Sequence, residues 1–116
     1  MQKVERWRLE ELEMLLADLA AVMKAGSQAE WAGVFGHFGH ELAFVQEGRT
    51  LDPAGLRRLV RNIRLCFGGS SGSPGPHLEG RDAGETAALN MRLTQLKAET
   101  ERALEEIELR LVEFIN

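Results

Sequence analysis

Tyrosine is absent from this 116-residue sequence, cysteine occurs once, and aromatic residues make up only 6%. The single cysteine, Cys66, excludes an internal disulfide and a Cys-x-x-Cys metal motif, and it fits a reducing compartment. No apolar run approaches the roughly 18 residues that suggest a membrane-spanning helix. The N-terminal residues mix charged side chains with leucines, unlike a secretion signal. We therefore expect a cytoplasmic protein without a membrane partner.

A strong charge of either sign is also lacking, because 18 acidic and 14 basic side chains leave a formal net charge of −4. A nucleic-acid-coating protein needs a basic footprint, so this balance argues against a nucleic-acid partner. A mildly acidic chain instead suits docking onto a basic partner. The length is that of one domain with its own core, and we expect residues 1–116 to form a single helical domain.

Glycine and proline are missing from residues 85–116, where apolar residues recur at steps of three, four or their sums. This spacing places them on one stripe of an amphipathic helix. The stripe consists of Leu89, Leu93, Leu96, Leu104, Ile107, Leu111 and Phe114. Asp82 and Glu85 have the spacing of a capping box, which predicts a helix over about 84–115. Such a rod, about 45 Å long at about 1.5 Å per residue, needs other helices beside it.

Three further helices are predicted upstream by the same periodicity, over about 2–25, 28–47 and 53–67. Their predicted inward-facing residues are Trp7, Leu9, Leu12, Leu15, Leu16, Leu19, Val22 and Met23 in the first, Trp31, Val34, Phe35, Phe38, Leu42 and Val45 in the second, and Leu56, Leu59, Val60, Ile63 and Phe67 in the third. The pattern predicts an all-α fold, an antiparallel four-helix bundle.

Capping signals support these boundaries. Gly26 lies where a C-terminal cap of the first helix belongs. Ser27 and Glu30 have the spacing of a capping box for the second. Asp52 followed by Pro53 is a strong start signal for the third, since it combines an N-cap residue with proline at the first helical position.

The Gly/Pro-rich loop at 68–83 joins the third and fourth helices. A stretch of this length without periodicity is either functional or a mobile connector. A phosphate cradle is disfavoured, because a P-loop needs GxxxxGK[ST] after a strand and here a helix precedes a segment without lysine. A flexible connector and an ordered recognition loop remain as the two alternatives.

Three glycines, Gly33, Gly36 and Gly39, are unusual inside the second helix, where each costs about 1 kcal/mol relative to alanine. We favour the interpretation that they let another helix approach closely. The alternative is a break or kink near Gly36.

Candidate catalytic and metal-binding groups are few. His37, His40 and Glu41 lie within little more than one helical turn, but neither a repeated Glu-x-x-His nor a His-Glu-x-x-His motif is present. A polar helix face is favoured over a metal site. Cys66 is interpreted as a buried structural thiol, because no histidine can be placed beside it as a base. We expect neither enzymatic activity nor a cofactor.

The third helix carries Arg57, Arg58, Arg61 and Arg64 and no acid after Asp52. An RNA-binding stripe has this appearance, but so does a solvated face or one that pairs with an acidic neighbour. The last helix offers such a neighbour through Glu85, Glu99, Glu101, Glu105, Glu106, Glu108 and Glu113. Given the net charge, internal pairing or a solvated face is favoured.

Residues 56–73, LRRLVRNIRLCFGGSSGS, together with Trp31 and with Asn90 before a leucine-spaced helix, resemble a family of small helical bacterial proteins of unknown function. The shared element is a Gly-Gly-x-x-Gly-Ser turn, here Gly68, Gly69, Gly72 and Ser73. This chain departs from the family after the turn, where it has Pro74-Gly75-Pro76-His77-Leu78 instead of an Asn-Asp pair.

The resemblance implies an immunity protein that binds and sterically neutralises a cognate secreted toxin, of the kind found with contact-dependent and type VI secretion systems. The surfaces expected to meet the toxin are the last helix and the loop. Their candidate partner-binding residues are Glu99, Glu101, Glu105, Glu108, Ser70, Ser71 and His77. The alternative is a homodimeric helical adaptor or secretion-chaperone-like scaffold. A third possibility is an enzyme or metal protein built around His37, His40 and Glu41.

Overall fold

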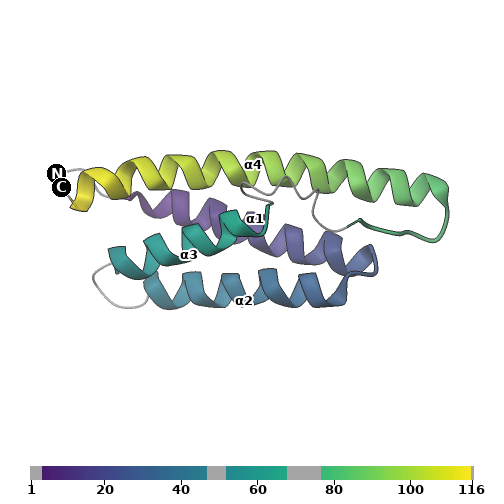
Figure 1. Cartoon of the computed structure of the whole chain (residues 1–116), viewed down its shortest axis with the longest axis horizontal. Coiled ribbons are helices and arrows are strands. Elements are labelled where there is room, and N and C mark those ends of the chain that lie inside the picture. The colour runs from purple at the N-terminus through teal and green to yellow at the C-terminus, as the bar shows by residue number, and fades with distance from the viewer. Residues whose placement is uncertain (1–3, 47–51, 68–76, 116) are drawn as a thin grey trace.

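The computed structural model describes residues 4–46, 52–67 and 77–115, with residues 112–115 described by their backbone alone. They form α1 (Arg6–Ala25), α2 (Ala29–Gln46), α3 (Pro53–Leu65) and α4 (Ala83–Ile115). No strand occurs in these ranges. Consecutive helices run in opposite directions (Figure 1), so the predicted all-α four-helix bundle is confirmed.

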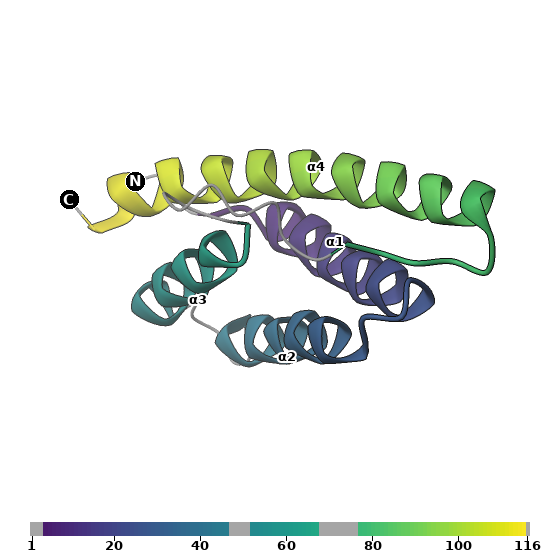
Figure 2. The same cartoon turned by 45° about the vertical axis from the view of Figure 1, so that its right-hand side comes forward.

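The order of the helices around the core follows from their contacts. α1 packs against α2 and α4, and α3 packs against the same two helices. Seen obliquely, α1 and α3 therefore lie between α4 and α2 (Figure 2). α4 spans the molecule, whereas the 13 residues of α3 cover only the C-terminal part of the 33-residue α4 (Figure 1).

The core forms mainly from the predicted stripes, to which the structure adds Val4, Leu78 and Ala103. Its members are Val4, Leu9, Leu12, Leu15, Leu16, Leu19, Val22, Met23, Phe35, Phe38, Leu42, Val45, Leu56, Leu59, Val60, Ile63, Leu78, Leu93, Leu96, Ala103, Leu104, Ile107 and Leu111. Trp31, Phe67 and Leu89 are half-buried against it, and the side chain of Phe114 lies outside the described part. Thr100 is fully buried, and its hydroxyl donates to the Leu96 carbonyl at 2.6 Å. None of the described helices has the length and apolar character that crossing a membrane requires.

Two predicted core residues are on the surface. Trp7 is 50% exposed, because its indole N–H donates to the Glu5 carboxylate at 2.6 Å and the Arg8 guanidinium lies 4.2 Å from the ring centroid. Val34 is 38% exposed. α2 packs against α1 and α3 but makes no comparable contact with α4, so its buried stripe is narrower than predicted.

The corner between α1 and α2 differs from the predicted capping. Ser27 has φ 67°, in the left-handed region. Its N–H donates to the Lys24 carbonyl and that of Gln28 to the Met23 carbonyl, which is the hydrogen-bond pattern of a Schellman motif. The predicted Ser27–Glu30 capping box is wrong, because α2 begins at Ala29, one residue later than that cap requires. The Ser27 hydroxyl instead contacts the distant Glu79 carbonyl at 3.4 Å.

Gly26 is needed for close approach, since its own φ of −91° suits any residue. A β-carbon at this position would lie 2.6 Å from Cβ of Leu78 and 2.8 Å from its Cδ2. By contrast, a β-carbon at Gly33, Gly36 or Gly39 would meet nothing within 4 Å. The predicted close helix approach there is wrong, and α2 continues through all three glycines without a break.

The predicted starts of α3 and α4 are confirmed. Asp52 accepts a hydrogen bond from the Gly55 N–H at 3.1 Å, with Pro53 in the first turn. Asp82 accepts from the Glu85 N–H at 2.8 Å. The Glu85 carboxylate accepts a hydrogen bond from the Arg81 N–H at 3.1 Å. In a standard capping box it would accept from the N–H of the cap residue, Asp82, so the contact is shifted by one residue.

Residues 77–80, named here the strap, seal the half of the bundle that α3 does not reach. Leu78 is fully buried between the α1–α2 corner and α4. The Asn90 side chain accepts from the Leu78 N–H at 3.0 Å and donates to the Leu78 carbonyl at 2.8 Å. On the other side, the Glu79 N–H donates to the Gly26 carbonyl at 3.0 Å. This part of the predicted loop is therefore ordered, bound to both α1 and α4.

Candidate partner-binding surface

The structure places three of the four predicted glutamates of α4 in solvent. Glu99, Glu101 and Glu105 are exposed and have no ion-pair partner among the described residues. Glu108 is less exposed and pairs with Arg64 of α3. Their carboxylates are therefore available to a partner to different degrees.

Helical geometry divides these four residues between two sides of α4. At about 100° per residue, Glu101, Glu105 and Glu108 fall within one narrow sector, while Glu99 lies on the opposite side. The Arg64–Glu108 pair shows that the shared sector borders α3. Glu101, Glu105 and Glu108 therefore form one acidic row on α4, and Glu108 at its end borders α3.

The candidate residues in the loop have separate surroundings. His77 is exposed, and its backbone carbonyl accepts a hydrogen bond from the Gln28 side chain at 2.9 Å. Ser70 and Ser71 lie outside the described residues. His77 belongs to the strap and lies apart from the acidic row.

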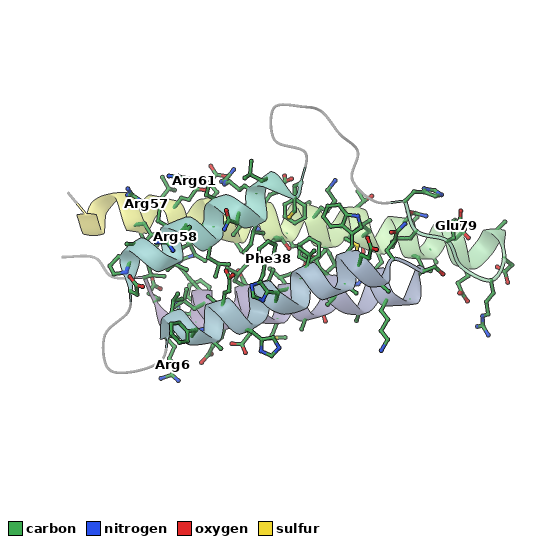
Figure 3. The ribbon with its side chains drawn as sticks, turned by 60° about the horizontal axis from the view of Figure 1, so that its bottom comes forward. Arg6, Phe38, Arg57, Arg58, Arg61 and Glu79 are labelled. Carbon is green, nitrogen blue, oxygen red and sulfur yellow. The ribbon has the colours of Figure 1, made fainter. Side chains whose placement is uncertain are left out.

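A row of arginines faces the acidic row from α3. Arg57, Arg61 and Arg64 are spaced four and three residues apart and share one side of the helix. Figure 3 shows Arg57 and Arg61 along the edge of α3 beside α4, whereas Arg58 lies on the outer surface. Of these arginines, Arg64 alone has a carboxylate partner among the described side chains. Among the described residues, the favoured prediction of internal pairing or a solvated face holds as pairing for Arg64 and as a solvated face for Arg58 and Arg61, which are exposed.

Along the arginine row, with Glu108 on its other side, runs an open groove of about 370 Å³, named here the arginine groove. Its lining residues are Arg57, Arg61, Arg64, Glu108 and Leu111. A second hollow of about 420 Å³ shares Arg64 and Glu108 with it and adds Glu105 and Leu109. Because the two hollows share residues, they form one trough along the α3–α4 face. Leu109 at its edge is 55% exposed.

The described residues that were considered as metal ligands or as a nucleophile lie apart from the α3–α4 face. His37 Nε2 lies 2.7 Å from Glu41 Oε1 on the exposed side of α2. Within the described ranges, no set of three or more His, Cys, Asp or Glu side chains is arranged to hold a metal ion. Cys66 was predicted to be buried, but it is half-buried; its thiol is 3.6 Å from the Asn62 carbonyl oxygen, and burial raises the pKa of this thiol.

A separate charged cluster ties the start of α1 to the end of α4. The Glu5 carboxylate accepts hydrogen bonds from Arg110 at 3.0 Å, Trp7 at 2.6 Å and Arg8 at 3.3 Å. Arg8 and Arg110 both also contact Glu106 Oε2, at 3.5 and 3.3 Å. The Arg110 and Trp7 hydrogen bonds lower the pKa of Glu5. The cluster satisfies its own charges, so we assign it a structural role.

Sequence reasoning identified the acidic row but not the groove beside it. The arginines of α3 were named, but their face was interpreted as paired or solvated, and Leu109 was missed. The spacing of the arginines carried a signal for the groove, but the relative level of α3 and α4 was needed to see that Arg57 and Arg61 lack an acidic partner among the described residues. Comparison with protein-family models, curated proteins and solved structures found no match.

Proposed function

We propose that this protein is a cytoplasmic immunity protein that neutralises a secreted bacterial toxin by covering part of it with the α3–α4 face. This face consists of Arg57, Arg61 and Arg64 on α3 and Glu101, Glu105 and Glu108 on α4. The observation that carries the proposal is the row of exposed carboxylates at Glu101 and Glu105, which have no ion-pair partner among the described residues. Complementary charge speeds the capture of a partner and fixes its orientation.

Steric inhibition also requires that the binding surface keep its shape. α4 is held at one end by Leu78 and Asn90 of the strap contact and at the other by Arg110 and Glu106 of the Glu5 cluster. A helix fixed at both ends presents its side chains with little loss of conformational freedom on binding. These contacts support a role in blocking a partner.

The direct test is co-expression with the product of the adjacent gene. We expect that product to arrest growth when expressed alone and to be harmless together with this protein. A product that is harmless alone would exclude the immunity function.

Charge reversal then tests the face. We expect Glu101→Lys combined with Glu105→Lys to weaken the complex by at least about tenfold, because two attractive contacts become repulsive. The matched control is Glu13→Lys with Glu30→Lys, which changes the net charge equally at exposed glutamates of α1 and α2. Equal weakening by the two double variants would reject this surface.

A homodimeric adaptor or secretion-chaperone-like scaffold is the second candidate. It is favoured by large apolar side chains in solvent, namely Met14, Phe44, Leu65 and Met91, which are 64–74% exposed. Light scattering of the purified protein decides the matter. A stable dimer that captures no tight partner supports the scaffold, and a monomer excludes it.

A further inference from the structure

We propose that the arginine groove binds an acidic, amphipathic helical segment of the partner protein. This inference rests on the proposed function and deepens it. In that function, basic groups of the partner meet the acidic row, and the acidic helix is a second element of the same partner. It concerns Arg57, Arg61 and Arg64 on one wall and Leu109 at the edge of the trough.

The first support is the local charge. α3 carries four arginines and no acid, although the whole chain has a net charge of −4. Three of these arginines line the groove, and among the described lining residues one carboxylate, Glu108, lies opposite them. Its partner is Arg64, which leaves Arg57 and Arg61 without a described carboxylate. A hollow lined mainly by one sign of charge focuses the electric field and attracts the opposite charge.

The second support is the spacing. Arg57, Arg61 and Arg64 extend over about 10 Å along α3, at about 1.5 Å per residue. Aspartate or glutamate at positions i, i+4 and i+7 of a helix lying parallel to α3 would have the same spacing. Arginine also suits this contact, because its planar guanidinium can bind both oxygens of a carboxylate.

The third support is the apolar edge. Leu109, which shares the second hollow with Arg64, is 55% exposed. Leucines on the neighbouring stripe of an acidic helix would cover such side chains. A free phosphate ion or the phosphate backbone of a nucleic acid carries no such apolar stripe and would leave Leu109 exposed.

A labelled synthetic peptide provides the test. The probe is a fluorescein-labelled helical peptide of about 18 residues, with glutamates at i, i+4 and i+7 and leucines on the adjacent stripe. The control peptide has lysine at each glutamate position. We expect fluorescence anisotropy to show binding of the acidic peptide alone, weakening as salt rises.

Variants of α3 supply the matched comparison. We expect Arg57→Glu with Arg61→Glu to weaken peptide binding by about tenfold or more, and Arg57→Gln with Arg61→Gln to weaken it by about threefold. Arg58→Glu on the outer surface of the same helix should change it by less than about twofold. Far-UV circular dichroism verifies that each variant remains helical.

Four outcomes would overturn the inference. The first is an equal loss of peptide binding in Arg58→Glu and Arg61→Glu, and the second is displacement of the peptide by millimolar inorganic phosphate. The third is tighter binding of a short RNA than of the peptide, and the fourth is self-association of the protein that Arg61→Glu abolishes. The last would identify a second copy of the chain as the occupant.

Failure of this inference is separable from failure of the proposed function. If the wild-type protein neutralises the toxin and the Arg57→Glu, Arg61→Glu variant does so equally well, the groove is not used and the immunity function stands. If the adjacent gene product is harmless but the peptide results hold, the immunity function fails and the groove remains a binding site.

Discussion

Replacing Gly26 by alanine tests the contact between the strap and the α1–α2 corner. The added β-carbon would lie 2.6 Å from Cβ of Leu78, an atom close to the backbone that cannot swing aside. The strap must therefore move and expose Leu78, whose burial contributes about 1.5–3 kcal/mol, and the hydrogen bonds of the strap weaken with it. We expect a destabilisation of about 3 kcal/mol, or about 12 °C in Tm at about 4 °C per kcal/mol.

The same change elsewhere should have the opposite sign. A β-carbon at Gly39 meets nothing within 4 Å, so Gly39→Ala in the middle of α2 should stabilise the protein by about 1 kcal/mol. Thermal unfolding followed by circular dichroism measures both variants. A neutral or stabilising Gly26→Ala would refute the close-approach argument.

A double-mutant cycle makes the test sharper. Leu78→Ala removes most of a fully buried side chain and should cost about 3 kcal/mol by itself. Since both substitutions disrupt the same strap, the double variant should lose about 4 kcal/mol, about 2 kcal/mol less than the sum. Additive losses would show that Gly26 and Leu78 act independently.

Three further predictions concern other contacts. Asn90→Ala should destabilise by about 2 kcal/mol, since two backbone groups of Leu78 lose their partner, and denaturant unfolding measures this. Glu5→Gln should lower stability at neutral pH, and the difference from wild type should shrink as the pH falls below 4.5, because the lowered pKa of Glu5 contributes stability only while its carboxylate is ionised. Cys66 should react slowly with a thiol reagent at pH 8, since burial raises its pKa and reduces the thiolate fraction, and denaturant should accelerate the reaction.

Each of these has a contradicting result. Equal stability of Asn90→Ala and wild type would mean that the strap does not depend on the side-chain amide. A pH-independent effect of Glu5→Gln would exclude the charged contacts with Arg110 as its cause. Labelling of native Cys66 as fast as that of the unfolded chain would show that the thiol is not protected.

Regular features of the fold were predictable from the sequence because they depend on neighbouring residues. The 3.6-residue period predicted the buried stripes of all four helices, and Asp52 and Asp82 predicted two helix starts through local hydrogen bonds. Trp7 was misassigned because periodicity measures direction around a helix and does not reveal that a neighbouring carboxylate and guanidinium would hold the ring at the surface.

Features that join distant segments were not predictable in this way. Gly26 looked like a conformational cap, but its role depends on Leu78, 52 residues later. The glycines of α2 looked like contact points, but nothing approaches them. The candidate site shows the same limit. Its glutamates were recognised because they are frequent in the last helix of the sequence. The arginine groove exists only because α3 ends level with Glu108 of α4.

Because α3 is short, the residues around the strap that stabilise the fold lie apart from those of the proposed binding groove. Around the strap, stability depends on a glycine, a leucine and an asparagine whose sizes and hydrogen bonds are fixed by their neighbours. Along the arginine groove, the charged side chains border solvent and are not among the buried core residues. Substitutions beside α3 can therefore accumulate while the interior stays the same, and under the proposed function they would allow related chains to diverge in specificity without refolding.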